Sequence, residues 1–216
     1  MTYLQAINKV LRRLREDEVT SADETSYSKL IGEFINDANR AVEDAWDWSM
    51  LRTITPVTSI TSTSAIVSVG GLTEADKILS VYNITDNVEV QLGSQQGLYN
   101  SVYIEQAPRG RPDNYVTLGQ DSSGNTTLRF YPDSDGSRVV LFNYVGRTPE
   151  LTNSNDVVKA PSTPVVQLAH AMAAEERGET GGTNASKLYA VAQSSLSDAI
   201  AMDAGRFPTE TVWYDV

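Results

Sequence analysis

The chain has 216 residues, a length that fits one large domain or two small ones. Hydrophobic residues make up 40% and charged residues 21%, which is typical of a folded globular chain, and no apolar run approaches the roughly 20 residues that span a bilayer. The formal net charge of −11 argues against a protein that grips nucleic acid, because binding phosphates needs clustered lysine and arginine. An acidic wall can still surround DNA without holding it, since it repels a polyanion. The absence of cysteine excludes disulfides and thiolate metal sites.

The first helix is predicted at Thr2–Arg15, where apolar residues recur at three- and four-residue steps and form one stripe. Thr2 is the expected N-cap, because its side-chain oxygen can accept an otherwise unpaired backbone N–H. This helix is the basic segment of the chain and carries Arg12 and Arg13. A membrane-surface anchor is an alternative for a basic amphipathic helix, but a core-facing stripe is favoured because the next helix offers a matching apolar face.

The second helix is predicted within the stretch Tyr27–Trp48, with Ser26 or Ser28 as its cap. One face of this helix is apolar. The opposite face carries the acidic residues Glu33, Asp37 and Asp44. Trp46 and Trp48 stand two residues apart and cannot share one helical stripe. We therefore expect Trp46 to be the last core residue of the helix and Trp48 to be the first residue of an extended segment.

Short runs rich in valine, isoleucine and threonine follow, and turn residues separate them, so the middle of the chain is predicted to be β-structure. The predicted strands are Thr53–Ile60, Ala65–Val69, Lys77–Ile84, Val88–Leu92, Val102–Gln106, Asn114–Leu118, Thr126–Tyr131 and Arg138–Val145. The last two are expected to form a hairpin across the tight-turn residues Pro132–Gly136. Gly93–Asn100 is expected to be an irregular loop. Strands at this spacing suggest an antiparallel sandwich or barrel.

Helical periodicity returns after Pro161 and predicts two helices, at residues 162–178 and 183–205. Because helices of this length need a partner face, we expect all four helices to pack together. The predicted fold is therefore α+β, with a four-helix bundle formed by both termini and an inserted antiparallel β-sandwich or barrel. The expected domains are residues 1–52 plus 148–216 for the helical bundle with its C-terminal tail, and residues 53–147 for the inserted β domain.

No catalytic, cofactor or metal site is predicted. His170 is the single histidine, and it lies inside a predicted helix without a nucleophile elbow. Asp133–Gly136 suggests a calcium loop, but Arg138 and Tyr144 stand where such a loop needs glycine and glutamate. The glycine-rich stretch at 181–187 lacks the ending of a phosphate loop and does not follow a strand. We therefore expect a protein that is not an enzyme.

The end of the chain, residues 206–216, has no helical pattern but is rich in aromatic residues. Its three large rings are Phe207, Trp213 and Tyr214. A chain end frays unless it is docked, so three rings indicate a binding segment. Docking on a partner and folding back on the chain's own helices are both open.

Three motifs, taken in order along the chain, resemble the tail tubular protein A and head-to-tail adaptor family of short-tailed phages. Ala6–Leu14 is similar to the opening helix of that family. Ile35–Val42 followed by Trp46–Trp48 is similar to a second helix that ends in tryptophan before the β part. Leu128–Tyr144 is similar to a hairpin of the family, with the pattern L-R-F-Y-P followed by D-G and tyrosine. The order helix, helix, β insertion, helix, helix is also that of the family.

The resemblance implies a structural adaptor of the virion, which forms a ring of twelve copies between the portal protein and the tail nozzle protein. Genomic DNA would pass through the channel of this ring without specific binding. No membrane partner and no cofactor are implied. The protein would be made in the host cytoplasm and reside in the virion tail at the portal vertex.

The resemblance also implies contact residues. In related adaptors the C-terminal segment docks on the portal. The expected portal anchors are therefore Phe207, Trp213 and Tyr214. The first two helices would contact neighbouring subunits. In that contact the basic residues Arg12 and Arg13 would pair with the acidic residues Glu33, Asp37 or Asp44.

Other functions remain as alternatives. A head-completion or tail-terminator protein of a longer-tailed phage would share the ring but bind different partners. A carbohydrate-binding module is a second alternative, because tyrosines of the β block can stack on sugars. These are Tyr82, Tyr99, Tyr103 and Tyr115. A phage cell-wall hydrolase is a third alternative, although no catalytic constellation supports it.

Overall fold

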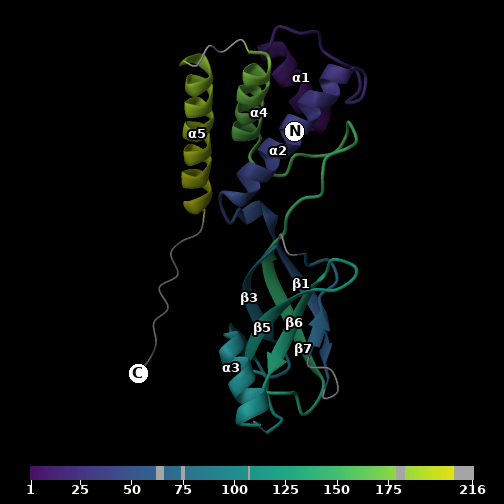
Figure 1. Ribbon diagram of the computed structural model, residues 1–216, viewed down its shortest axis with the longest axis vertical. Coiled ribbons are helices and arrows are strands. Elements are labelled where there is room, and N and C mark those ends of the chain that lie inside the picture. Colours follow the sequence, from purple (N-terminus) through teal and green to yellow (C-terminus); the bar gives the residue numbers. More distant parts are fainter. Residues whose placement is uncertain (62–65, 74–75, 107, 179–182, 207–216) are drawn as a thin grey trace. The chain divides into compact units, whose positions relative to one another are not determined.

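The computed structural model describes residues 1–61, 66–73, 76–106, 108–178 and 183–206 (Figure 1). The chain divides into two compact units. The first comprises Met1–Leu51 with Thr148–Val216 and is called the helical unit below. The second comprises Arg52–Arg147 and is called the β unit. The described residues contain five α-helices and a seven-stranded sheet, so the fold is α+β.

Helices α1 (Tyr3–Arg13) and α2 (Ser26–Asp44) both begin with a capping box. Thr2 caps α1 as predicted: its hydroxyl accepts from the backbone N–H of Gln5 at 3.3 Å. The two predicted caps of α2, Ser26 and Ser28, are wrong, because Thr25 is the N-cap. The hydroxyl of Thr25 accepts from the backbone N–H of Ser28 at 2.9 Å. In return, the hydroxyl of Ser28 accepts from the backbone N–H of Thr25 at 3.0 Å. A serine thus replaces the glutamate or glutamine that usually completes this motif.

The predicted roles of Trp46 as a core residue of the helix and of Trp48 as the start of an extended segment are both wrong. Helix α2 ends at Asp44, and Trp48 is fully buried whereas Trp46 is 38% exposed. The chain folds back after the helix, so that the Trp48 indole donates to the carbonyl of Val42 at 2.7 Å. The three-residue helix η1 (Ser49–Leu51) follows. Helical periodicity could not place either ring, since both lie beyond the end of the helix.

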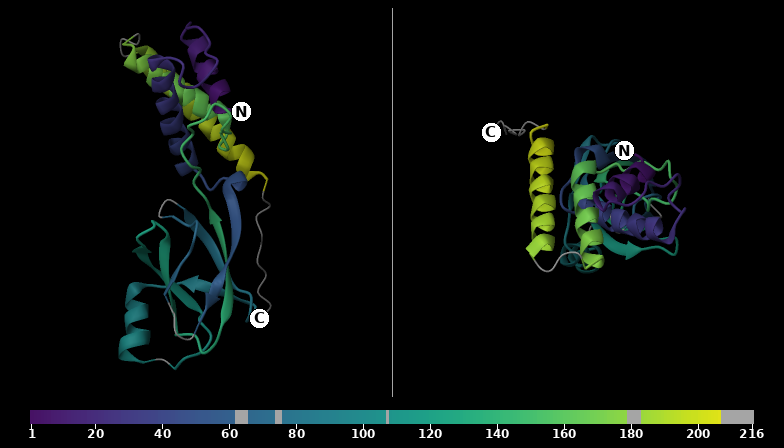
Figure 2. Two further views of the ribbon diagram at one scale, coloured as in Figure 1. Left: turned by 90° about the vertical axis from the view of Figure 1, so that its right-hand side faces the viewer. Right: turned by 90° about the horizontal axis from the view of Figure 1, so that it is seen from above.

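The helical unit is a three-helix core with a fourth helix on its side. Helix α4 (Ser162–Glu176) packs on α1 and α2, which also pack on each other, whereas α5 (Thr183–Ala204) packs chiefly on α4. The view from above in Figure 2 shows α4 between α5 and the other two helices. The expected four-helix bundle is therefore not what the structure shows. In the described side chains of α5 only Ala192 and Asp203 are buried.

The segment that returns from the β unit, residues 148–161, runs along α2 and α1. The Asn36 amide donates to the Leu151 carbonyl and accepts from the Leu151 backbone N–H, both at 3.0 Å. At the start of α1, the backbone N–H of Tyr3 donates to the carbonyl of Asp156 at 2.8 Å. These bonds attach the returning segment to the two N-terminal helices.

The β unit contains one curled sheet (Figure 1). Its strands are β1 (Arg52–Ile60), β2 (Ile66–Ser68), β3 (Lys77–Asn83), β4 (Val88–Leu92), β5 (Asn114–Gln120), β6 (Thr126–Tyr131) and β7 (Arg138–Val145). The order across the sheet is β1-β7-β3-β4-β5-β6-β2. The β4–β5 pair is parallel and the other pairs are antiparallel. The predicted sheet is therefore corrected from wholly antiparallel to mixed.

The predicted hairpin between β6 and β7 does not form. Strand β6 pairs with β5 and β2, whereas β7 pairs with β1 and β3. The two strands instead face each other across the core, where the rings of Phe130 and Phe142 pack edge to face at 6.4 Å. The connection between β6 and β7 is hydrogen-bonded to the loop that precedes β5: the backbone N–H of Gly110 donates to the carbonyl of Asp133 at 2.9 Å.

The segment after β4 is helical where a loop and a strand were expected. Helix α3 (Gln95–Tyr99) begins at the cap Ser94, whose hydroxyl accepts from the backbone N–H of Gly97 at 3.0 Å. A π-helical turn, η2 (Asn100–Ile104), continues it. Valine, tyrosine and isoleucine at 102–104 favour a strand by composition, but Tyr103 and Ile104 are exposed and have no sheet neighbour to pair with.

Candidate functional site

The structure assembles no catalytic or metal centre from the residues it describes. His170 lies half-buried in α4, where burial and the nearby charge of Arg13 lower the pKa of its imidazole. Within the described ranges, no three His, Cys, Asp or Glu side chains gather in a way that could hold a metal ion. Every helix in those ranges is too short or too polar to cross a membrane.

The acidic turn at Asp133–Gly136 is held by arginine rather than open to a cation. Arg129 pairs with Asp133 at 2.7 Å, and Arg138 pairs with Asp135 at 2.6 Å. The hydroxyl of Ser134 donates to the carbonyl of Gly136 at 2.6 Å, which closes the turn. The glycine-rich stretch at 181–187 joins α4 to α5, and its first two residues lie outside the described part of the chain.

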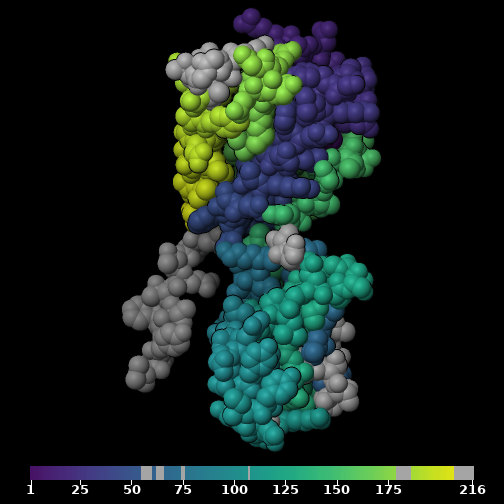
Figure 3. All heavy atoms as spheres, viewed as in Figure 1, coloured from purple at the N-terminus to yellow at the C-terminus, as the bar shows by residue number. Residues whose placement is uncertain are grey.

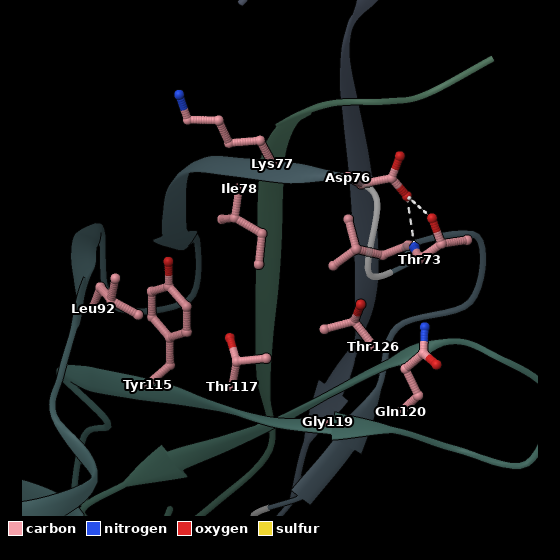
Figure 4. A pocket seen from close by; sticks show the side chains of 11 residues that line it. Thr73, Asp76, Lys77, Ile78, Leu92, Tyr115, Thr117, Gly119, Gln120 and Thr126 are labelled. Atoms are coloured by element: carbon pink, nitrogen blue, oxygen red, sulfur yellow. Dashed lines mark hydrogen bonds between the residues drawn. The ribbon is translucent and has the colours of Figure 1, made fainter. Parts of the chain in front are cut away.

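The β unit has a pocket of about 380 Å³ inside the curl of its sheet (Figure 4). Ile78, Leu92 and Tyr115 form one side of this pocket, and burial together with the charge of Glu89 raises the pKa of the Tyr115 hydroxyl. The other side is polar. There the carboxylate of Asp76 accepts from the backbone N–H of Thr73 at 2.6 Å and from its hydroxyl at 3.0 Å. The pocket therefore combines an aromatic wall with a hydrogen-bonded rim.

The tyrosines that suggested carbohydrate binding do not share one surface. Tyr82 is exposed on β3, and Tyr115 is buried next to Phe130, with ring centroids 6.1 Å apart. Tyr99 at the end of α3 and Tyr103 in η2 are both exposed, with their rings 6.0 Å apart and tilted by 39°. Only this pair offers adjacent open rings among the four.

A second concave surface lies in the helical unit, at the end of α5. This groove, called the α5 groove below, has a volume of about 240 Å³. It is lined by Trp48, Met50, Pro161, Ala199, Met202, Asp203 and Arg206. Met50 and Met202 are 45% and 69% exposed, so two large apolar side chains of this groove are open to solvent. In Figure 3 the lower end of α5 (yellow) adjoins the segment that follows α2 (blue).

Asp203 holds the α5 groove together. Its carboxylate accepts from the backbone N–H of Ser49 at 3.0 Å, from the Ser49 hydroxyl at 2.5 Å and from the Trp46 indole at 3.2 Å. Arg206 lies 3.7 Å from the same carboxylate. Burial raises the pKa of Asp203, but the hydrogen bonds from Ser49 and Trp46 outweigh it and the net effect is a lowered pKa. Asp203 therefore remains charged at neutral pH.

The sequence contains a signal for Asp203 that is easily missed. An acidic side chain in the last turn of a helix opposes the helix dipole, so another interaction has to compensate. The groove itself has no such signal, since its lining comes from residues 48–50, 161 and 199–206.

The residues expected at subunit contacts are all exposed. Arg12 and Arg13 lie in the last turn of α1, and Arg12 pairs with Glu18 of the same chain at 3.2 Å. The acidic residues Glu33, Asp37 and Asp44 lie on the open face of α2. The expected portal anchors Phe207, Trp213 and Tyr214 lie outside the described residues.

The described residues therefore form an α+β fold that contains the pocket of the β unit and the α5 groove and carries exposed charges on α1 and α2. The family model described as SU10 adaptor protein matches residues 1–211 of this chain. The chain therefore belongs to the SU10 adaptor protein family, a family of phage head-to-tail adaptors, and is a virion component that interacts with other virion components. Among curated proteins no match is found.

Proposed function

We propose that the protein is the adaptor that joins the portal to the tail of a phage virion, in a ring of twelve copies around the DNA channel. The family match over residues 1–211 carries this proposal. The role is structural and involves no catalysis or cofactor. The protein is made in the host cytoplasm and takes its place at the portal vertex, between the portal protein and the tail nozzle protein.

The division of the chain gives each unit its own task in this proposal. The helical domain, residues 1–52 plus 148–216, makes the portal and neighbour contacts, and residues 53–147 form the inserted β domain. The net charge of −11 lets DNA slide past during ejection, because an acidic wall repels phosphates and does not retain them.

Portal docking is assigned to the aromatic end of the chain. Phe207, Trp213 and Tyr214 supply three large rings, and buried aromatic side chains contribute most to protein interfaces. The ten residues 207–216 follow directly on the groove residue Arg206. The segment can therefore extend from the end of α5 toward a partner, with a reach of up to about 35 Å when fully extended.

Electron microscopy of the purified protein, alone and mixed with the portal protein, tests the proposal. We expect rings on the portal, whereas the free protein is allowed to be monomeric. A triple variant Phe207→Ala, Trp213→Ala, Tyr214→Ala should fail to bind the portal. The matched control Thr209→Ala, Glu210→Ala, Thr211→Ala changes as many residues of the same segment and should bind.

Two outcomes would contradict the proposal. If the unaltered protein forms no complex with the portal, the adaptor role fails. If rings form only at the distal end of an assembled tail, the protein is instead a tail terminator of the kind expected for longer-tailed phages.

A further inference from the structure

We propose that the α5 groove binds an aromatic side chain from residues 207–216 of the same chain. The free subunit then holds its own C-terminal segment on the helical unit. This inference concerns the isolated protein and goes beyond the proposed portal contact, which needs the same segment in a second position.

The size and lining of the groove fit an aromatic ring. An apolar protein cavity of about 150 Å³ is large enough to bind benzene, so the volume of about 240 Å³ admits a phenyl, phenol or indole group. Trp48 is fully buried and contributes an apolar wall. Met50 and Met202 line the groove, and much of their surface is exposed. Methionine side chains are flexible and make favourable contacts with aromatic rings, so these two can adapt to a ring in the groove.

The polar groups of the groove do not oppose an apolar occupant. Asp203 is buried, with 4% of its surface exposed, and its carboxylate already accepts hydrogen bonds from Ser49 and Trp46. Arg206 is exposed and supplies a positive charge to the lining of the groove. Arg206 lies 3.7 Å from that carboxylate, so the positive and the negative charge of the lining offset each other.

The position of the groove in the chain selects this occupant. Arg206 both lines the groove and directly precedes Phe207, whose Cα must lie about 3.8 Å from that of Arg206. Phe207 is therefore bonded directly to a residue that lines the groove. Between Arg206 and Tyr214 the extended chain spans up to about 28 Å. This length allows the chain to turn back, so that the ring of Trp213 or Tyr214 can also reach the groove. A tethered segment also acts at an effective concentration of about millimolar, which favours it over a free partner.

Occupation of the groove would regulate assembly. A segment that is bound in its own groove is not available to a portal. The apparent affinity for the portal is therefore the intrinsic affinity multiplied by the fraction of subunits in which the segment is free. Portal docking then becomes an exchange of one aromatic pocket for another. The ring in the groove is thereby kept from solvent before the subunit meets the portal.

Methyl NMR of the full chain tests the inference in the absence of any partner. The chain has four methionines, of which Met50 and Met202 line the groove, and Met172 in α4 does not. With ¹³C-labelled methionine methyl groups, we expect ring-current shifts at Met50 and Met202 in the unaltered protein. The triple variant Phe207→Ala, Trp213→Ala, Tyr214→Ala should remove those shifts and leave the Met172 signal unchanged.

The single variants at the three positions identify which ring enters the groove. The control variant Thr209→Ala, Glu210→Ala, Thr211→Ala, which keeps all three rings, should retain the shifts. Identical Met50 and Met202 signals in the unaltered protein and the triple variant would overturn the proposal. Shifts that disappear on dilution would mean that a second copy supplies the ring, and would overturn it as well. Because no portal is present, neither result depends on the adaptor role.

Discussion

The carboxylate of Asp203 accepts two hydrogen bonds from Ser49, which precedes it by 154 residues in the chain. One comes from the Ser49 backbone N–H at 3.0 Å and one from its hydroxyl at 2.5 Å. Asp203 lies near the end of α5, the helix that packs chiefly on α4 alone. A single carboxylate therefore attaches the end of this helix to the turn that follows α2.

Replacing Asp203 should destabilise the helical unit. Asp203→Ala leaves the donors of Ser49 and Trp46 without their acceptor, and loss of hydrogen bonds to a charged group costs about 2 kcal/mol in the free energy of unfolding. Asp203→Asn keeps an acceptor and should cost less. Urea denaturation measures both. Asp198→Ala, at an exposed position of the same helix, is the control and should change little.

The contribution of Asp203 should also depend on pH. Its pKa is lowered in the folded protein, so the stabilisation is fully present above the ordinary aspartate pKa and is lost as the pH falls through the folded value. The difference in unfolding free energy between the unaltered protein and Asp203→Ala should therefore shrink in acid. A difference that stays constant from neutral pH down to about pH 2 would show that the charge of Asp203 is not responsible.

The sequence predicts the four longer helices α1, α2, α4 and α5 and most strands, because these depend on local periodicity, whereas the short helix α3 lies where a loop was expected. Thr2 as a cap and the apolar stripe of α1 are both confirmed. Which strands pair depends on residues far apart in the sequence, and the predicted pairing of β6 with β7 is wrong. The turn composition of Pro132–Gly136 predicts a hairpin, yet β6 and β7 each find other partners, since both must cover the same core with Phe130 and Phe142.

The interaction surfaces are predicted less well than the fold. Charges on open helix faces, such as Arg13 and Asp37, can be found from helical spacing alone. The α5 groove cannot, because Trp48 and Met202 meet only after α5 has packed against the turn beyond α2. The aromatic content of 207–216 indicates a binding segment, but composition does not identify what that segment binds.

Asn36 is a second residue whose loss should be costly. It is 7% exposed, and its amide forms a pair of hydrogen bonds with the backbone of Leu151. Asn36→Ala leaves a buried N–H and a buried carbonyl unsatisfied, which should lower the free energy of unfolding by about 3 kcal/mol. Asp37→Ala, on the exposed face of the same helix, is the matched control. Equal stability of the two variants in urea would contradict the predicted role of Asn36.

Gly32 and Tyr3 should show strong coupling. A Cβ added at Gly32 would overlap the hydroxyl of Tyr3 and lie 3.1 Å from the ring carbon that bears it. Gly32→Ala should therefore destabilise the protein by about 1 kcal/mol, although alanine favours a helix by about the same amount. In a Tyr3→Phe background the overlap with oxygen is absent, so Gly32→Ala should become neutral or stabilising. A double-mutant cycle measured by denaturation that gives additive effects would disprove the close approach.

Charge reversal on α1 tests the proposed contact between subunits. Arg12 pairs with Glu18 of its own chain, whereas Arg13 has no carboxylate within ion-pair distance among the described residues. Arg13→Glu should therefore weaken ring assembly on the portal more than Arg12→Glu, and the double variant most of all. Each exposed pair contributes only about 0.5 kcal/mol, but the loss recurs at every contact of the ring and grows at low salt.

Lys9→Glu, also exposed on α1, is the control, and combining Arg13→Glu with Glu33→Arg and Asp37→Arg should restore rings. Counting rings by electron microscopy decides the matter, since assembly by the double variant at the level of the unaltered protein would exclude this contact.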